Sequence, residues 1–440
     1  MDLLKDNPHK LFWKFLIPAV SSAIAVAAYS FVDTIVIGHG VGPEGTAACA
    51  IVLPIFTIGH FIALLCGIGG SVLMSRARGA GNQEKGDAYF TASLLYALIV
   101  TGTVWVLGVL FQKPLYRLFG ADDSLLPYAY EYGKWIFGAF PSFVFVYFLG
   151  TFIRTDGSPK FVMFVTLLGG VINIIGDIVL VFPLKMGMTG AAIATVAGSV
   201  VQTVVLTAYI LLGKTSLHLA KPYQWGRAVK NITILGIGAG ISQIASTVVT
   251  YIINNQIMRY SGPAALAVYG MMSTVVALFL SIFSGVGEAA QPIVSVNFGA
   301  GKPERYRATG KLGLKTAAVM GAMCFGLCAL FPEQVASIFM KVTPEIAEIA
   351  PYIIRVYAIA FMPMAVNLFA TAYLQSVSKA NKATTVSMLR GLVLSSVLLY
   401  ILPLFMGGDG IWWAVTLAED LAMVIAIIYL DPEIRISNLK

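Results

Sequence analysis

The chain has 440 residues, of which 58% are hydrophobic and 11% are charged, and its mean hydropathy is +0.83. Soluble domains carry about 25% charged residues, so this composition excludes a soluble globular protein and indicates an all-α polytopic membrane protein. The net charge of +8 does not indicate nucleic-acid binding, because most Lys and Arg residues fall in short loops between apolar runs, where they report membrane orientation.

Apolar runs long enough to cross a bilayer recur along the whole chain. A transmembrane helix needs about 20 apolar residues, and the first run is too long for a cleaved signal peptide. The sequence therefore predicts a multi-pass protein of the cytoplasmic (inner) membrane. The twelve predicted spans are 12–37, 47–74, 88–111, 128–153, 161–183, 189–212, 232–258, 264–296, 312–332, 348–374, 384–406 and 410–430.

Lys and Arg are distributed unequally between the two sets of loops. The N-terminus, the even-numbered loops and the C-terminus hold most of them. The odd-numbered loops hold only five, which are Lys113, Arg117, Lys185, Arg259 and Lys341. Because cytoplasmic loops are enriched in Lys and Arg, both termini are predicted to be cytoplasmic.

The two halves of the chain repeat at a nearly constant offset. GAGNQEK at 79–85 returns as GAGKPER at 299–305, 220 residues later, and Pro141 matches Pro363 at an offset of 222. Six spans per half is an even number, so the halves should form two pseudo-symmetric six-helix lobes with the same orientation.

The repeat also sets the predicted domains. We expect an N-lobe at 1–212, a cytoplasmic linker at 213–230 and a C-lobe at 231–440. Two such lobes could enclose a central cavity and give alternating access by rocking.

Polar residues on three spans fall at one predicted depth. Asn173 and Asp177 lie at i and i+4 in an apolar run, so they share one helix face. Asp33, Asp177 and Thr195 each lie about five or six residues from the outer end of a span, which is about 8–10 Å from the same surface. A charge at this position in the bilayer is costly and is a functional candidate by default.

These groups predict an ion-coupling site made of Asp33, Asn173, Asp177 and Thr195. Carboxylates in surroundings poor in water favour their protonated form, and two carboxylates with an amide and a hydroxyl also offer hard oxygen ligands to Na⁺. The coupling ion is therefore H⁺ or Na⁺. The alternative is that backbone groups or water satisfy each polar side chain separately.

No other metal or cofactor is predicted. The four cysteines form neither a CxxC motif nor a Cys/His cluster, and the chain lacks a P-loop for ATP. The four histidines are scattered, and no HExxH or GxSxG motif is present, so the chain is not expected to be an enzyme.

Span 8 supplies two candidates for a substrate cavity. Glu288 and Gln291 lie close to its predicted cytoplasmic end, in the run GVGEAAQPIVSVNFGAG. Glu288 could line the cavity and attract cations, or it could brace the loop beside Gln291, Pro292 and Asn297.

Span 12 carries two adjacent acids near its middle, Glu419 and Asp420. Neighbouring residues on a helix point about 100° apart, so at most one of them faces a given pocket. Asp420 is assigned to the substrate cavity. Pairing of these acids with Arg390 or Arg355 is the alternative.

Pro18 lies inside span 1, fifteen residues before Asp33. An interior proline removes a helix hydrogen bond and can kink the helix. Pro18 is therefore a candidate hinge for the segment that carries Asp33, and a static kink is the alternative.

The chain resembles the multidrug and toxic compound extrusion (MATE) family over essentially its full length. The resemblance is carried by the six-plus-six repeat, FVDTIVIG at 31–38, the paired GAG loops, and Asn173 and Asp177 followed by Thr195. The run EAAQPIVSVNFGA at 288–300 is more similar to the DinF-like and MepA-like branch than to the NorM branch.

The resemblance implies a secondary active antiporter that exports organic cations and amphipathic drugs, driven by an inward H⁺ or Na⁺ gradient. It also implies that Asp33, Asn173, Asp177 and Thr195 form the ion site of the first lobe. NorM-type members use further acids in helices seven and ten, where this chain has none. The small-molecule drug and the lipid bilayer are the expected partners, and the chain is expected to be a monomer.

Two other classes of transporter are the alternatives. A major-facilitator carrier should have an Asp before Arg76 in its second loop, and this chain does not. A flippase for a lipid-linked or amphipathic substrate, built on the same kind of lobes, is the closer alternative. Such flippases often have a strongly cationic cavity, whereas the charges within these spans are mostly acidic.

Overall fold

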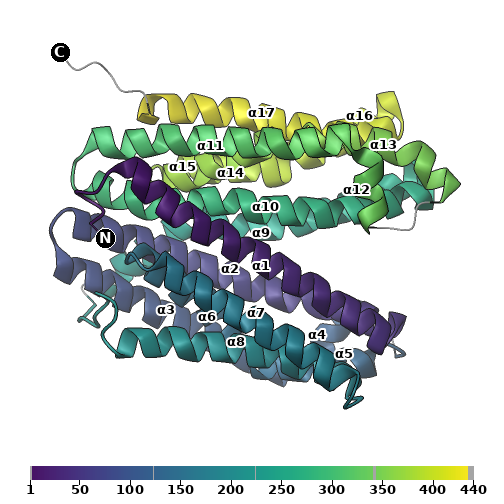
Figure 1. Cartoon of the computed structure of the whole chain (residues 1–440), viewed down its shortest axis with the longest axis horizontal. Helices are drawn as coiled ribbons and strands as arrows, with labels where there is room; N and C mark the ends of the chain where they lie inside the picture. Colours follow the sequence, from purple (N-terminus) through teal and green to yellow (C-terminus); the bar gives the residue numbers. More distant parts are fainter. Residues whose placement is uncertain (1, 122, 223, 340–342, 435–440) are drawn as a thin grey trace. The chain divides into compact units, whose positions relative to one another are not determined.

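The computed structural model describes residues 2–121, 123–222, 224–339 and 343–434, and within these ranges all regular elements are helical (Figure 1). In the first half of the chain they are α1 (Pro8–Gly40), α2 (Pro43–Gly79), α3 (Gln83–Leu110), α4 (Gln112–Leu118), α5 (Leu126–Gly138), α6 (Phe140–Thr155), α7 (Pro159–Val181) and α8 (Gly187–Leu211). In the second half they are α9 (Trp225–Tyr260), α10 (Gly262–Gly299), α11 (Pro303–Leu330), α12 (Pro332–Phe339), α13 (Pro344–Ala358), α14 (Phe361–Ser376), α15 (Ala380–Met388), the π-helix η1 (Leu389–Val393), α16 (Leu394–Met406) and α17 (Asp409–Ile434).

The predicted spans are confirmed as helices. In the described ranges, eleven helical stretches are long and apolar enough to cross a membrane, and the pair α5 and α6, bent by 49°, makes the twelfth. Predicted span 10 is built from α13 and α14, and predicted span 11 from α15, η1 and α16.

Proline accounts for the break in the fourth span. α6 begins at Phe140 with Pro141 in its first turn, where the missing N–H of proline costs nothing. The same residue in the middle of a continuous helix would remove a hydrogen bond and clash with the preceding turn. The chain therefore ends α5 at Gly138 and restarts as α6 in a new direction.

The chain divides into two compact units, Ser21–Gly240 and Met1–Val20 together with Ile241–Lys440. We call the first the N-unit and the second the C-unit. Their boundaries fall inside α1 and α9, whereas the sequence predicted boundaries in the loop at 213–230. Pro18 lies two residues before the boundary within α1.

Packing explains why α1 and α9 are each shared between the units. Leu11, Phe12 and Phe15 of α1 are fully buried in the apolar core of the C-unit. In α9, Ile232 is buried against Ala92 of the N-unit. The half of each helix that enters a core therefore belongs to the unit that buries it.

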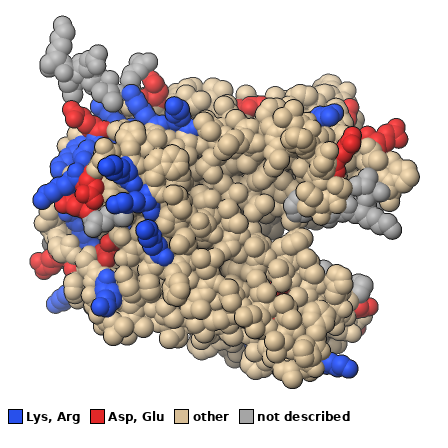
Figure 2. Space-filling model, viewed as in Figure 1, with Lys and Arg blue, Asp and Glu red and all other residues tan. Residues whose placement is uncertain are grey.

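Lys and Arg side chains gather at one end of the helices, as Figure 2 shows for the face that it draws. This matches the unequal loop charges in the sequence, since the loops rich in Lys and Arg all follow an even-numbered span. Of the five basic residues in the other loops, Lys341 lies outside the described residues.

Candidate ion-coupling site

α7 presents Asn173 and Asp177 on one face, as the sequence predicted from their i and i+4 spacing. Both side chains are buried in the N-unit, and Asp177 is 0% exposed. The surrounding residues of α7 are apolar, so this helix alone offers the carboxylate no compensating charge.

Thr195 of α8 joins α7 to α1. Its hydroxyl oxygen accepts a hydrogen bond from Asn173 Nδ2 at 3.3 Å, and the hydroxyl donates to Asp33 Oδ1 at 3.5 Å. The structure therefore brings together all four residues predicted for the ion site, from three helices of one unit.

Oxygen atoms at this site lack donors in the described part of the chain. Both carboxylate oxygens of Asp177 and the Oδ1 atom of Asn173 are buried without a hydrogen-bond partner there. The Asp33 and Asn173 side chains lie near the Asp177 carboxylate without the geometry of a hydrogen bond. A buried carboxylate without a partner is strongly disfavoured, so this set of oxygens fits a bound proton or a small hard cation such as Na⁺.

Glycines allow α7 and α8 to approach closely enough for these contacts. A Cβ atom on Gly198 would lie 2.8 Å from the backbone oxygen of Gly169, and one on Gly176 would lie 2.8 Å from the Cβ of Ala194. Because backbone atoms cannot rotate away, a side chain at position 198 would push the two helices apart.

A wedge between α7 and α8 is expected to disable the site. We expect Gly198→Leu to lower ion-coupled transport by about tenfold or more, because a shift of about 1 Å in reacting or binding groups can cost that much. The control is Gly102→Leu on α3, where an added Cβ would meet nothing within 4 Å. Transport measured in vesicles at matched protein content should separate the two variants, and equal activity would show that the Asn173–Thr195 contact is dispensable.

Three further residues lie near the carboxylates, and they were not predicted from the sequence. Tyr132 of α5 is 3% exposed and lies near Asp33, Asp177 and Thr195. Cys49 of α2 lies near both carboxylates, and Tyr29 of α1 lies near Asp33. None stands in one of the motifs that indicated the ion site, so only the folded chain places them there.

The residues predicted for a substrate cavity lie in the C-unit. Glu288 is half-buried and Gln291 is buried, both on α10, and Asp420 is half-buried on α17. The bracing contacts next to them are made by Asn297, which donates to the Leu3 carbonyl at 3.0 Å and accepts from Arg305 Nε at 2.8 Å.

The acid next to Asp420 has a partner. Glu419 forms an ion pair with Arg390, with 2.7 Å between Arg390 Nη2 and Glu419 Oε1. This is the pairing that the sequence left open as the alternative for these two acids.

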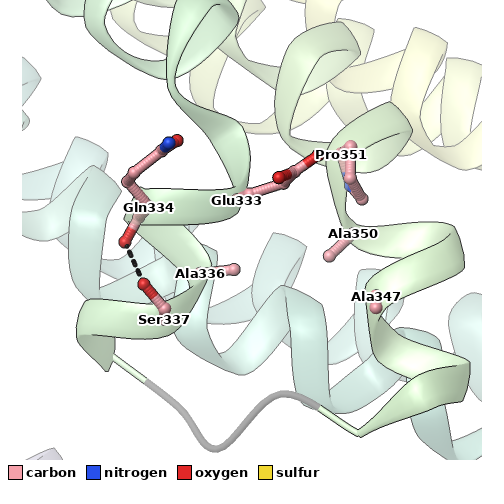
Figure 3. Close-up of a pocket in the computed structure, with 7 residues that line it drawn as sticks. All are labelled: Glu333, Gln334, Ala336, Ser337, Ala347, Ala350 and Pro351. Carbon is pink, nitrogen blue, oxygen red and sulfur yellow. Dashed lines mark hydrogen bonds between the residues drawn. The ribbon is translucent and has the colours of Figure 1, made fainter.

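A pocket of about 530 Å³ opens between α12 and α13 of the C-unit (Figure 3). Its lining residues are Glu333, Gln334, Ala336, Ser337, Ala347, Ala350 and Pro351. Ser337 Oγ donates to the Gln334 carbonyl at 2.9 Å, which ties up its hydroxyl. The pocket includes none of the residues predicted for the substrate cavity.

Two helical units, eleven or twelve candidate spans in the described residues and a buried acidic site inside one unit are typical of a membrane transporter. A family model described as MatE matches residues 18–179 and again residues 239–401. The chain therefore belongs to the MATE family of multi-pass membrane transporters, and the two matches confirm the predicted repeat. Membership also agrees with the expectation that the chain is a transporter and not an enzyme.

Relatives and solved structures agree with this family. The chain is 26% identical to the multidrug export protein MepA of Staphylococcus saprophyticus, over 97% of this chain and 94% of that protein. It is also 26% identical to the FAD transporter of Shewanella oneidensis, over 81% and 80% of the two chains.

Among solved structures, an outward-facing multidrug resistance MATE transporter of the MOP superfamily superposes with a TM-score of 0.92 at 22% identity, over 98% of this chain and 97% of that one. A MOP superfamily transporter from Pyrococcus furiosus superposes with a TM-score of 0.91, also at 22% identity, over the same shares of the two chains. These likenesses confirm the predicted fold.

Proposed function

We propose that this chain is a secondary active multidrug antiporter of the cytoplasmic membrane, which exports cationic or amphipathic organic compounds in exchange for H⁺ or Na⁺. The observation that carries this proposal is the Asp177 carboxylate, fully buried with neither oxygen hydrogen-bonded in the described part of the chain. Such a group needs a mobile positive charge to be stable. Similarity to multidrug export proteins supports the choice of substrate class.

The site can couple ion binding to a change of state. When the ion binds, the charges of Asp33 and Asp177 are compensated, and when it leaves they repel each other in surroundings of low dielectric constant. A ligand shifts a conformational equilibrium only through such differential interactions. α1 carries Asp33 in the N-unit and Pro18 in the C-unit, so a bend at this proline would transmit the change during alternating access.

An imposed ion gradient tests the proposal directly. Purified protein in lipid vesicles is given ethidium, first with a pH gradient and then with a Na⁺ gradient. We expect drug movement against its own gradient under one of the two conditions. Transport that depends on neither ion would overturn the antiport proposal and favour a flippase.

Glu288 is proposed to line the substrate path. We expect Glu288→Gln to weaken export of ethidium by roughly fivefold, the equivalent of about 1 kcal/mol of attraction across partly wet surroundings, and to leave a neutral substrate nearly unaffected. Glu345→Gln, an exposed acid at the start of α13, is the control. Equal loss for charged and neutral compounds would show that Glu288 has a structural role.

A further inference from the structure

Each unit buries an acid among its membrane-spanning helices, Asp177 in the N-unit and Glu419 in the C-unit, and the two acids differ in their partners. In the N-unit, Asp177 is fully buried and neither of its carboxylate oxygens accepts a hydrogen bond from the described residues. In the C-unit, Glu419 is 5% exposed and has a partner on each carboxylate oxygen. The same physical problem therefore has two different solutions in one chain.

The partners of Glu419 come from two other elements. Arg390 of η1 donates from Nη2 to Oε1 at 2.7 Å and from Nε to Oε2 at 3.0 Å, in the paired geometry that makes such bonds strong. Asn367 of α14 donates from Nδ2 to Oε2 at 2.8 Å and to the Glu419 carbonyl at 3.0 Å. The Arg390 and Glu419 side chains are only 12% and 7% exposed, so the pair is largely withdrawn from solvent.

Arg390 lies in a short π-helix between α15 and α16. Residues 389–393 form the π-helix η1, after which the Leu394 N–H donates to the Leu389 carbonyl. Ser395 Oγ donates to the Arg390 carbonyl at 2.6 Å. π-turns cost stability and are frequent at functional sites. The other titratable groups close to the pair are the Tyr357 hydroxyl of α13 and the neighbouring Asp420.

Each of the two sites takes a side chain from the last helix of its repeat, Thr195 from α8 and Glu419 from α17. Glu419 lies about 15 Å along α17 from its start, and Thr195 lies about 12 Å along α8 from its start, at 1.5 Å per residue. α8 and α17 are the sixth helices of the two repeats, as the matching GMTGAA and GGDGIW runs indicate. The last helix of each repeat therefore contributes one side chain to the polar site of its unit.

We propose that the Arg390 guanidinium is a built-in cation for Glu419. It compensates the charge of Glu419 in the C-unit, as a mobile ion compensates the charge of Asp177 in the N-unit. Asn367 donates its amide N–H to the Glu419 carboxylate, whereas Asn173 of the N-unit donates its amide N–H to Thr195. Resting on the proposed function, the consequence is that each transport cycle uses one exchangeable ion site, which lies in the N-unit. Without Arg390, Glu419 would become a second site that takes up a proton or Na⁺.

Ion binding by the purified, detergent-solubilised transporter tests this proposal. Proton uptake is followed in weakly buffered solution with a pH indicator, and ²²Na⁺ binding is measured in parallel. We expect Arg390→Gln to bind one more cation per protein than the wild type, and Arg390→Gln combined with Glu419→Gln to lose that gain. Arg390→Lys, which keeps the charge, and Arg355→Gln, which removes an exposed guanidinium, should both bind as the wild type does.

Glu419→Gln alone keeps the proposal falsifiable if Arg390→Gln does not fold. This nearly isosteric change should leave the number of exchangeable ions unchanged, whereas a lower number would show that Glu419 itself exchanges an ion and would overturn the proposal. A folded Arg390→Gln protein that gains no cation would also overturn it. Asp177→Asn reports separately on the N-unit site, so failure of the proposed antiport would be recognised independently.

Discussion

Replacing Asp177 with Asn is expected to abolish ion-driven export while the protein still reaches the membrane. The amide has nearly the same shape as the carboxylate but cannot take up the proton or balance the charge of Na⁺, so nothing couples the gradient to the change of state. The loss should be at least about tenfold, down to the rate of vesicles without protein. Asp33→Asn should have the same effect, because Asp33 lies beside Asp177 and accepts a hydrogen bond from Thr195.

The measurement is ethidium export from vesicles under the gradient that drives the wild type, at equal protein content. Asp409→Asn is the matched control, since it removes an exposed carboxylate at the first residue of α17. Full export by either site variant would contradict an essential role for the buried carboxylates. A parallel loss in Asp409→Asn would show that the assay responds to acidic charge in general.

The spans and the grouping at the candidate ion site were predictable from local rules. Apolar length fixes where a helix crosses the bilayer, and helical spacing places Asn173 and Asp177 on one face. Depth along the helices then put Asp33 and Thr195 at the same level, and in the N-unit hydrogen bonds join Asn173, Thr195 and Asp33, with Asp177 beside them. These inferences needed no knowledge of which helices are neighbours.

Features that depend on packing were not predictable. The loop at 213–230 has the composition of a linker, yet the units divide inside α1 and α9, because buried side chains such as Phe12 and Ile232 decide which core holds each half of a helix. Tyr132 comes near the carboxylates only through the path of α5. No motif in this sequence predicts the π-helix η1 that carries Arg390.

Replacing Arg78 with Ala is expected to destabilise the N-unit strongly. Arg78 at the end of α2 bonds to Asp87 of α3 at 2.7 Å and to Asp156 after α6 at 2.6 Å, and it also donates to the Ser216 carbonyl at 2.8 Å. The three ionised side chains are between 5% and 12% exposed. Removing the cation leaves two buried carboxylates facing each other, at a cost of about 3–5 kcal/mol.

A second Arg–Asp pair in the same unit provides the comparison. Arg117 and Asp123 are 3.2 Å apart, but their side chains are 65% and 94% exposed. Water already screens such a pair, so Arg117→Ala should cost at most about 1 kcal/mol. Thermal unfolding of the two variants in detergent, followed by tryptophan fluorescence, should give a much lower midpoint for Arg78→Ala. Equal midpoints would mean that Asp87 and Asp156 are compensated by other groups. If Arg78→Ala does lower the midpoint, adding Asp156→Asn should restore part of the lost stability, because it removes one of the two repelling charges.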